Sequence, residues 1–242
     1  MFHDKDFEYF EKIAHWSFDE YECHTECLTD WDLYEILKSV ATPDSRVLDL
    51  GTGGGEKLLK NFPDCAEIIG TDYSPNMIES ARANLAASGR KNITFKVMDN
   101  LNMDVPSDYF DIVVARHTCI DASQILRCLK PGGLLLLRGV DKYDCWSLKT
   151  LLGYGQGFDD RVPVSIVDYE NILQAGFRDV ELVPIHEREY YKDATTFKSF
   201  LEVVPILDHM PDDALLDEYI EHNTYGGRVL LLRRCYGITA RK

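Results

Sequence analysis

The sequence predicts an α/β protein whose sheet is mostly parallel and covered by helices. From about residue 46 to residue 137, short apolar runs alternate with amphipathic stretches, which is the rhythm of βαβ units. The first five expected strands would be mostly parallel. The strands are expected at residues 46–50, 67–71, 93–97, 110–115 and 134–137, with late strands near residues 180–187 and 228–237.

Two helices between these strands have recognisable ends. Ser74 is an N-cap residue followed by proline, and Gly89 is a stop signal for the helix expected over residues 76–87. A second helix is expected over residues 121–129, before a Lys-Pro-Gly-Gly turn into the next strand. Helices at these places support the parallel arrangement, because parallel strands need long crossover connections.

The segments outside this block have a different composition. Residues 1–40 are rich in aromatic and acidic residues and predict two or three helices that form an N-terminal helical cap. Residues 142–160 combine aromatic residues with three glycines, and residues 193–222 have a helical pattern. We expect both to be lid or substrate insertions of a single domain over residues 1–242, because no repeat or linker divides the chain.

The bulk composition limits the class of protein. The 242 residues are 45% hydrophobic and 28% charged, which suits one substantial core. No apolar run is long enough to span a membrane and the first residues do not form a secretion signal, so we expect a soluble, cytoplasmic protein. Seven scattered cysteines do not suggest a disulfide framework, and a net charge of −15 argues against a nucleic-acid partner.

Glycines stand at alternate positions directly after the first expected strand. Gly51, Gly53 and Gly55 leave room for a sharp turn and let a ligand approach the main chain closely. A simple tight turn would use glycines in the same way. A dinucleotide fold, however, usually places its third glycine three positions after the second. This spacing and the strand-ending carboxylate of Asp49, which would repel a pyrophosphate but accept hydrogen bonds from an ammonium group, favour S-adenosylmethionine over NAD.

Two more acidic residues close the second and third strands. Asp72 stands where a carboxylate accepts hydrogen bonds from ribose hydroxyls, and Ser74 already serves the alternative role of helix N-cap. Asp99 could read an adenine ring or simply occupy a turn. The neighbours expected beside the ribose and adenine are Tyr73, Met77, Asn100 and Leu101.

These residues resemble the motifs of class I S-adenosylmethionine-dependent methyltransferases. VLDLGTGGG at residues 47–55 fits the glycine motif D-x-G-x-G-x-G completely. GTDYSPNM at residues 70–77, FDIVVAR at residues 110–116 and LKPGG at residues 129–133 are similar to the acidic motif, the fourth-strand motif and the turn before the fifth strand. The likeness covers about ninety residues and is loose in the C-terminal third.

The resemblance implies a Rossmann-like three-layer sandwich, with a seven-stranded, mostly parallel sheet, an antiparallel last strand and a helical lid. It also implies a small-molecule methyl acceptor, with nearest kin among methyltransferases of the ubiquinone-biosynthesis type. The expected cofactor-binding residues are Asp49, Gly51, Thr52, Gly53, Asp72, Tyr73, Ser74, Met77, Asp99, Asn100, Leu101 and Arg116.

Methyl transfer is an in-line displacement that needs alignment and exclusion of water more than a fixed set of catalytic groups. Arg116 is expected near the methionine end of the cofactor. His117 could act as a general base, since its ordinary pKa suits neutral pH, or it could be a surface or capping residue. Trp31 or Tyr21 could reach the substrate or the sulfonium through a cation–π contact.

Other functions stay open at this point. Cys23, His24 and Cys27 could suggest a metal, but no second pair completes four ligands, so we expect no metal site. An RNA or protein methyltransferase, a non-catalytic S-adenosylmethionine-binding protein and an NAD-dependent oxidoreductase are the alternatives. The acidic charge weakens the first of these for RNA.

Overall fold

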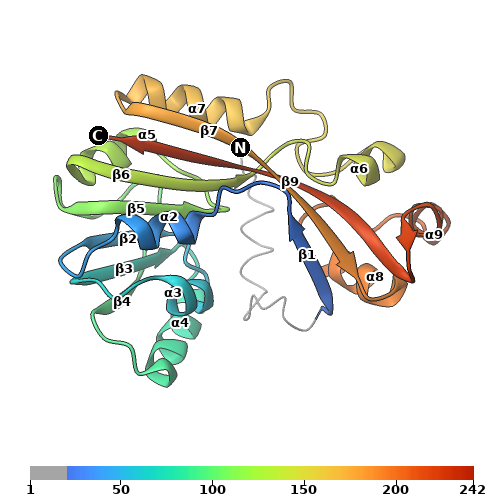
Figure 1. Ribbon diagram of the computed structural model, residues 1–242, viewed down its shortest axis with the longest axis horizontal. Coiled ribbons are helices and arrows are strands. Elements are labelled where there is room, and N and C mark those ends of the chain that lie inside the picture. Colours follow the sequence, from blue (N-terminus) through green and yellow to red (C-terminus); the bar gives the residue numbers. More distant parts are fainter. Residues whose placement is uncertain (1–20) are drawn as a thin grey trace.

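The computed structural model describes residues 21–242, so the first half of the N-terminal helical cap expected over residues 1–40 lies outside the described part. The described chain forms one sheet in the order β1-β7-β9-β6-β5-β2-β3-β4, with β8 paired to β9 (Figure 1). The strands are β1 Cys23–Cys27, β2 Arg46–Leu50, β3 Glu67–Asp72, β4 Ile93–Val97, β5 Phe110–Arg116, β6 Leu129–Val140, β7 Arg178–Tyr191, β8 Thr224–Tyr225 and β9 Arg228–Arg241.

Strands β2 to β6 form the parallel half of the sheet, as the sequence predicts. Apolar side chains from helices fill both of its faces, which makes three layers. One core joins the sheet to α2, α3 and α4, and the other joins it to α5 and α7. The helices are α2 Leu33–Val40, α3 Glu56–Asn61, α4 Pro75–Ser88, α5 Ala122–Cys128, α6 Trp146–Leu152, α7 Val164–Ala175, α8 Ala194–Val203 and α9 Asp213–His222.

The local signals for the two central helices are confirmed. The Ser74 hydroxyl accepts a hydrogen bond from the backbone N–H of Met77 at the start of α4, and Gly89 ends that helix in the left-handed conformation. Asp121 caps α5 by accepting from two backbone N–H groups. The expected strand at residues 134–137 is longer, because β6 begins at Leu129 and the chain bulges before Leu134 takes up the regular parallel register.

The expected count of seven strands is wrong for the described chain, which has nine. β9 is antiparallel to its neighbour β6, as the resemblance implies. The two additional strands are β8, a short hairpin partner of β9, and β1, which lies at the sheet edge on β7. β1 also corrects the expectation of helices alone in the first forty residues. Its exposed residues pair with residues more than 150 positions later, and nothing in the local sequence records such a partner.

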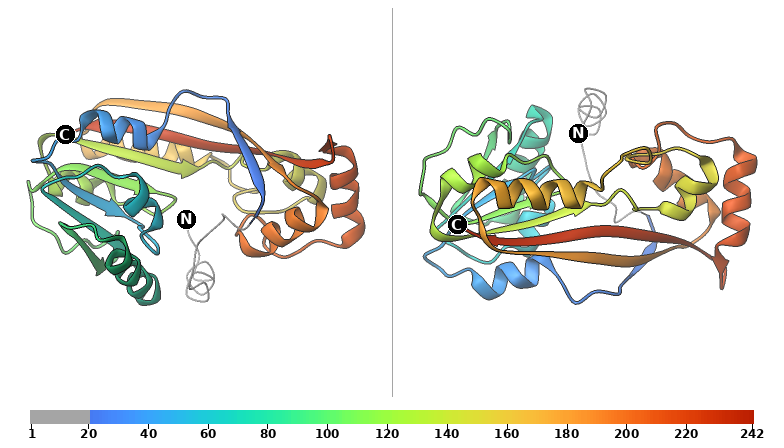
Figure 2. Two further views of the ribbon diagram at one scale, coloured as in Figure 1. Left: turned by 60° about the horizontal axis from the view of Figure 1, so that its bottom comes forward. Right: turned by 90° about the horizontal axis from the view of Figure 1, so that it is seen from above.

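β7 and β9 are each 14 residues long and extend past the parallel half (Figure 2). Their far ends carry α6, α8 and α9, which enclose a third apolar core with Phe197, Phe200 and Leu231. We call this part the distal lobe: α6, α8, α9 and the ends of β7 and β9 beside them. The two segments expected as insertions, residues 142–160 and 193–222, thus meet in one place.

Two further observations concern the chemistry of the described chain. All seven cysteines are free, and Cys65, Cys128 and Cys235 are buried as their apolar surroundings predict. Within residues 21–242, no helix is long and apolar enough to cross a membrane.

Candidate functional site

The glycine turn joins β2 to α3 at the carboxyl edge of the parallel strands. Gly51, Gly53 and Gly55 all have positive φ angles, of 73°, 56° and 78°, a conformation that glycine adopts without strain. The backbone N–H of Gly51 donates to the Thr71 carbonyl at 2.9 Å, which ties the turn to β3. A Cβ on Gly51 would lie 2.6 Å from Thr118 Cβ. Position 51 therefore needs glycine for two reasons: the positive φ angle, and the close approach of the loop that contains Thr118.

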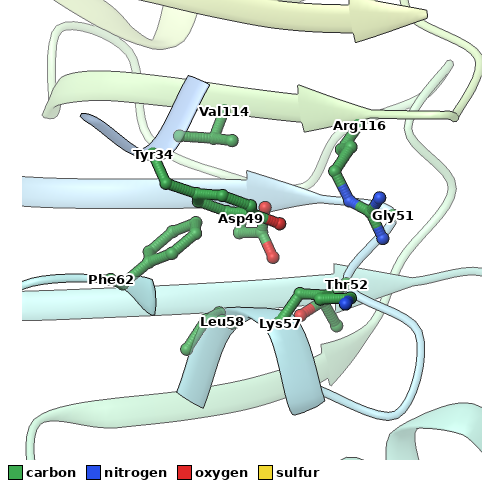
Figure 3. A pocket seen from close by; sticks show the side chains of 9 residues that line it. All are labelled: Tyr34, Asp49, Gly51, Thr52, Lys57, Leu58, Phe62, Val114 and Arg116. Atoms are coloured by element: carbon green, nitrogen blue, oxygen red, sulfur yellow. The ribbon is translucent and has the colours of Figure 1, made fainter. Parts of the chain in front are cut away.

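Asp49 ends β2 beneath this turn and is buried. It lines a small cavity of about 20 Å³ together with Tyr34, Thr52 and Arg116 (Figure 3). Burial raises the pKa of the Asp49 carboxyl to about 7, although the Thr52 hydroxyl and the Arg116 guanidinium act to lower it. Asp49 therefore exchanges its proton near neutral pH, and a cation placed beside it would favour the charged form.

Asp72 closes β3 next to the glycine turn and holds that turn in place. Its two carboxylate oxygens accept backbone hydrogen bonds from Gly53 and Ser74, both at 2.9 Å. Burial raises the pKa of Asp72, while these N–H groups oppose the shift. An ionised carboxylate has about four acceptor positions, and the backbone N–H of Tyr73 also contributes a hydrogen bond, so acceptor capacity remains for about one hydroxyl donor of a ligand.

The three residues expected around Asp72 differ in their exposure. Tyr73 is 53% exposed at the strand end, so its ring is accessible to a ligand. Ser74 and Met77 are buried, and the Ser74 hydroxyl is used in capping α4. The structure thus leaves Tyr73 as the most available of the three for contact with a ligand.

The residues that follow β4, the third strand with an acidic end, also include both exposed and buried side chains. Asp99 and Leu101 are exposed, and the Asp99 side chain accepts the backbone N–H of Leu101 in a turn. Asn100 points inward instead. Its amide donates to Thr118 Oγ1 at 2.9 Å and accepts from Thr71 Oγ1 at 3.3 Å. Asn100 therefore joins three strand ends internally, which its sequence position next to Asp99 does not reveal.

Arg116 and His117 follow one another at the end of β5. His117 has a φ of 52°, which is unusual for a residue with a side chain and stores local strain. Its backbone N–H donates to the Arg138 carbonyl at 2.8 Å. Although His117 is exposed, desolvation by surrounding protein and the charges of Arg116 and Arg138 lower its pKa well below the ordinary value. The imidazole is therefore neutral at pH 7 and a weaker base than an ordinary histidine.

The structure adds residues that sequence reasoning missed. Tyr34 on α2 lines the cavity with Asp49, Thr118 packs on the glycine turn, and Arg138 on β6 lies beside Arg116. Of these three, only Arg138 could have been predicted from the sequence. It directly follows the apolar strand expected at residues 134–137, and the expected strands beside that one also end in candidate site residues. Trp31 packs on Gly237 of β9.

The Cys23 to Cys27 segment is the edge strand β1, with both cysteines exposed. In residues 21–242 there is no group of three or more His, Cys, Asp or Glu side chains arranged to hold a metal ion.

Comparison with known proteins agrees with this geometry. Residues 41–152 match the family model described as a methyltransferase domain. The uncharacterized methyltransferase YcgJ of Bacillus subtilis is 33% identical over 120 residues, which are 46% of this chain and 47% of YcgJ. The ubiquinone/menaquinone biosynthesis C-methyltransferase UbiE of Paraburkholderia phytofirmans is 28% identical over 147 residues, 53% of this chain and 60% of UbiE. The ribosomal protein L11 methyltransferase of Burkholderia thailandensis is 33% identical over 111 residues, 44% of this chain and 35% of that protein.

The matched part of the chain thus spans between 35% and 60% of the length of these curated relatives. A solved structure of a putative methyltransferase from Bacillus halodurans shares the fold, with a TM-score of 0.59 at 19% identity over 87% of this chain and 98% of that one. The likeness to this structure shows a Rossmann-like fold, with the candidate site at the carboxyl edge of its parallel strands. Residues 41–152 of this chain, somewhat less than half of it, thus match a methyltransferase-domain family.

Proposed function

We propose that this protein transfers a methyl group from S-adenosylmethionine to a small-molecule acceptor. The observation that carries the proposal is the junction of the glycine turn with Asp72, where the Gly53 N–H and the carboxylate are already hydrogen-bonded at 2.9 Å. That contact brings the glycine turn and the acidic side chain together, which supports binding of one nucleoside-like ligand to both. The methyltransferase-domain match over the same residues supports the assignment.

The residues present fit this cofactor. The hydroxyl of Thr52 is buried in the glycine turn, where only the Asp49 carboxyl acts on it, and a polar atom with so little pairing suits a bound ligand. Asp72 would hold the ribose, Asp99 with Tyr73 and Leu101 the adenine side, and Asp49 with Arg116 the amino-acid end. When bound, the cofactor supplies an electrophilic methyl group on a positively charged sulfur.

The chain's own groups have two tasks in such a reaction. The first is alignment, since displacement at a methyl group requires the acceptor atom to lie opposite the leaving sulfur. The second is removal of a proton from the acceptor, where the acceptor has one to lose. His117 at the end of β5 is the candidate for the second task, because its imidazole is neutral, but its lowered pKa makes it a weak base for this role.

The proposal also names the class of methyl acceptor, a small molecule. Relatives include one enzyme named for quinone biosynthesis and one named for a ribosomal protein, so similarity alone leaves the acceptor open. The net charge of −15 disfavours RNA. The distal lobe stands beyond the end of β6, where the expected lid segments have come together, and we assign to it the closing of the acceptor site.

Asp72→Ala tests the proposed function. Loss of hydrogen bonds to a charged group should weaken binding of S-adenosylhomocysteine, the reaction product, by about 1–3 kcal/mol in isothermal titration. Asp104→Ala, which removes an exposed carboxylate of the same half, is the matched control and should leave the affinity unchanged. Equal affinity of wild type and Asp72→Ala would remove Asp72 from the site. Binding of S-adenosylhomocysteine without methyl transfer to any member of a metabolite library would favour a non-catalytic binding protein instead.

A further inference from the structure

Strand β1 is an open edge of the sheet. It pairs with β7 on one side, and no strand of the described chain, residues 21–242, lies on its other side. All of its residues are exposed, and because side chains alternate between the two faces of a strand, neither face is covered. In the view from above, β1 (blue) lies at the border of the molecule, with no described element beyond it (Figure 2, right). Such an edge is available for pairing with another strand.

The hydrogen bonds at the two ends of β1 show which of its backbone groups are free. Just beyond the strand, the N–H of Leu28 donates to the His186 carbonyl at 2.8 Å, and the N–H of Lys192 donates to the Glu22 carbonyl at 3.0 Å. Hydrogen-bonded and non-hydrogen-bonded positions alternate along an antiparallel ladder. The even-numbered residues of β1 therefore bond to β7. The odd-numbered residues direct their backbone N–H and C=O groups to the open side, and Thr25 is the middle one.

β1 lacks the features that usually keep strand edges of different molecules apart. Those features are proline, lysine and β-bulges. The sequence of β1, CHTEC, contains neither proline nor lysine, and its register with β7 is regular. At the opposite edge of the sheet, β4 carries the exposed Lys96. Of the two edges, β1 is therefore the one suited to pairing.

The side chains of β1 are complementary to those of a second β1 that runs in the opposite direction. In an antiparallel pair centred on Thr25, His24 of each copy lies opposite Glu26 of the other. The odd-numbered positions then meet as hydrogen-bonded pairs, with Cys23 opposite Cys27 on either side of Thr25. An imidazole N–H donates to a carboxylate, and both side chains are accessible, with exposed fractions of 62% for His24 and 44% for Glu26.

The Glu26 carboxylate has capacity left for such a partner. Within its own chain it accepts from the Tyr190 hydroxyl at 3.4 Å and lies 3.8 Å from Arg188 Nη1. The His24 imidazole of the same chain is 3.9 Å away. These contacts are long, and a carboxylate accepts about four hydrogen bonds, so Glu26 can accept one more from outside.

Other registers of the same pair bring like charges together. Because only the odd-numbered positions can bond on the open side, the neighbouring antiparallel registers differ by two residues. One of them places Glu26 opposite Glu26 of the second copy, and the other places it opposite Glu22. Like charges directly opposite each other are destabilising. The register centred on Thr25 avoids both arrangements.

We propose that β1 is a dimerisation edge, to which a second copy of this chain adds its own β1 in antiparallel register about Thr25. The contact uses the same residues on both sides, as a two-fold symmetric dimer requires. The sheets of the two copies become continuous through the pair. Because a single short strand makes a small interface, the dimer is reversible, with a dissociation constant at the micromolar end of the range for protein complexes.

Sedimentation velocity of the full chain, at concentrations from micromolar to millimolar, measures the association. We expect monomer at the low end and dimer at the high end. Thr25→Pro removes the N–H at the centre of the pair, and because that group points to the open side, the change leaves the bonds between β1 and β7 intact. It should weaken the dimer about tenfold or more, whereas Thr25→Val, the control, keeps the N–H and should associate as wild type does. A wild type that stays monomeric throughout, or a Thr25→Pro variant that associates equally well, would overturn the proposal.

His24→Glu and Glu26→Lys test the register. Each change alone places two carboxylates or two donors opposite each other, so each variant should associate with itself about tenfold more weakly than wild type. In an equal mixture, the changed position 24 of one variant faces the changed position 26 of the other, and association should recover. Asp104→Lys, an exposed residue outside β1, changes the net charge as Glu26→Lys does and should not weaken the dimer. A mixture that associates no better than either variant alone would exclude this register.

Hydrogen exchange at the Thr25 amide separates a second copy from another occupant of the edge. A second copy predicts protection of this amide that increases with protein concentration. Protection that is already complete in the monomer and independent of concentration would assign the edge to residues 1–20 of the same chain, and the dimer proposal would fail.

Discussion

The parallel half and the distal lobe use polar residues in different ways. In the parallel half, Asp49, Asp72 and Asp99 lie at or near the ends of short strands. The backbone beside them does not occupy all the acceptor positions of their carboxylates. Beside the distal lobe, the buried charged groups pair with each other. Arg233 binds Asp144 with Nε and Nη2 and Glu189 with Nη1, all at about 3.0 Å. The first arrangement is ready for a ligand, and the second connects β9 to β7 and to the segment after β6.

Among the substitutions that test this difference between the two parts, Arg233→Met should have the largest effect, a loss of stability. It leaves two buried carboxylates without their cation, which costs about 3–5 kcal/mol of the free energy of unfolding. Chemical denaturation measures the loss, and Arg228→Met, an exposed arginine on the same strand, is the control. We expect S-adenosylhomocysteine to bind the remaining folded protein with unchanged affinity. A parallel loss of affinity would show that the two parts are coupled.

Two glycines with nearly the same φ angle provide the next test. Gly51 and Gly153 have φ of 73° and 77°, but a Cβ meets Thr118 at the first and nothing within 4 Å at the second. Gly153→Ala should cost only about 1 kcal/mol of stability through its backbone angle. Gly51→Ala should in addition weaken S-adenosylhomocysteine about tenfold or more in isothermal titration. If the two substitutions changed the affinity for S-adenosylhomocysteine equally, close approach of Thr118 to the glycine turn would not be needed for binding.

The smallest expected effect concerns pH. Burial raises the pKa of Asp49 to about 7, and only its charged form attracts the ammonium group of the cofactor. Affinity for S-adenosylhomocysteine should therefore rise about tenfold between about pH 6 and about pH 8. Asp49→Asn, which cannot ionise, should have a flat profile over the same range. A wild-type profile as flat as that of the variant would separate Asp49 from the amino-acid end of the ligand.

Sequence reasoning succeeded where the signals were local. The proline after Ser74 and the glycine at position 89 correctly predicted where α4 begins and ends. The apolar runs predicted the ends of β2, β3, β4 and β5 to within one residue. The glycine turn and the acidic strand ends were predicted as one group, and the structure brings Asp49, Asp72 and the turn together. The assignment of these residues to the cofactor stays a prediction.

Other features depended on partners far away in the chain. Asn100 follows an exposed aspartate, yet its amide is directed inward by Thr71 and Thr118. Cys23–Cys27 has no strong strand pattern and becomes a strand only because β7 offers an open edge. His117 combines a positive φ with a hydrogen bond from its backbone N–H to the neighbouring strand, and no residue in its own segment predicts either feature.

By itself, the sequence determined the class of fold, the position of the glycine turn and the carboxylates that end three successive strands, because these follow from periodicity, capping and the conformational freedom of glycine. The tertiary structure decided what those residues face. Register between β5 and β6 placed Arg116 beside Arg138, and the length of β7 and β9 created the distal lobe. Such contacts join segments far apart in the chain, and their geometry is set by packing rather than by local pattern.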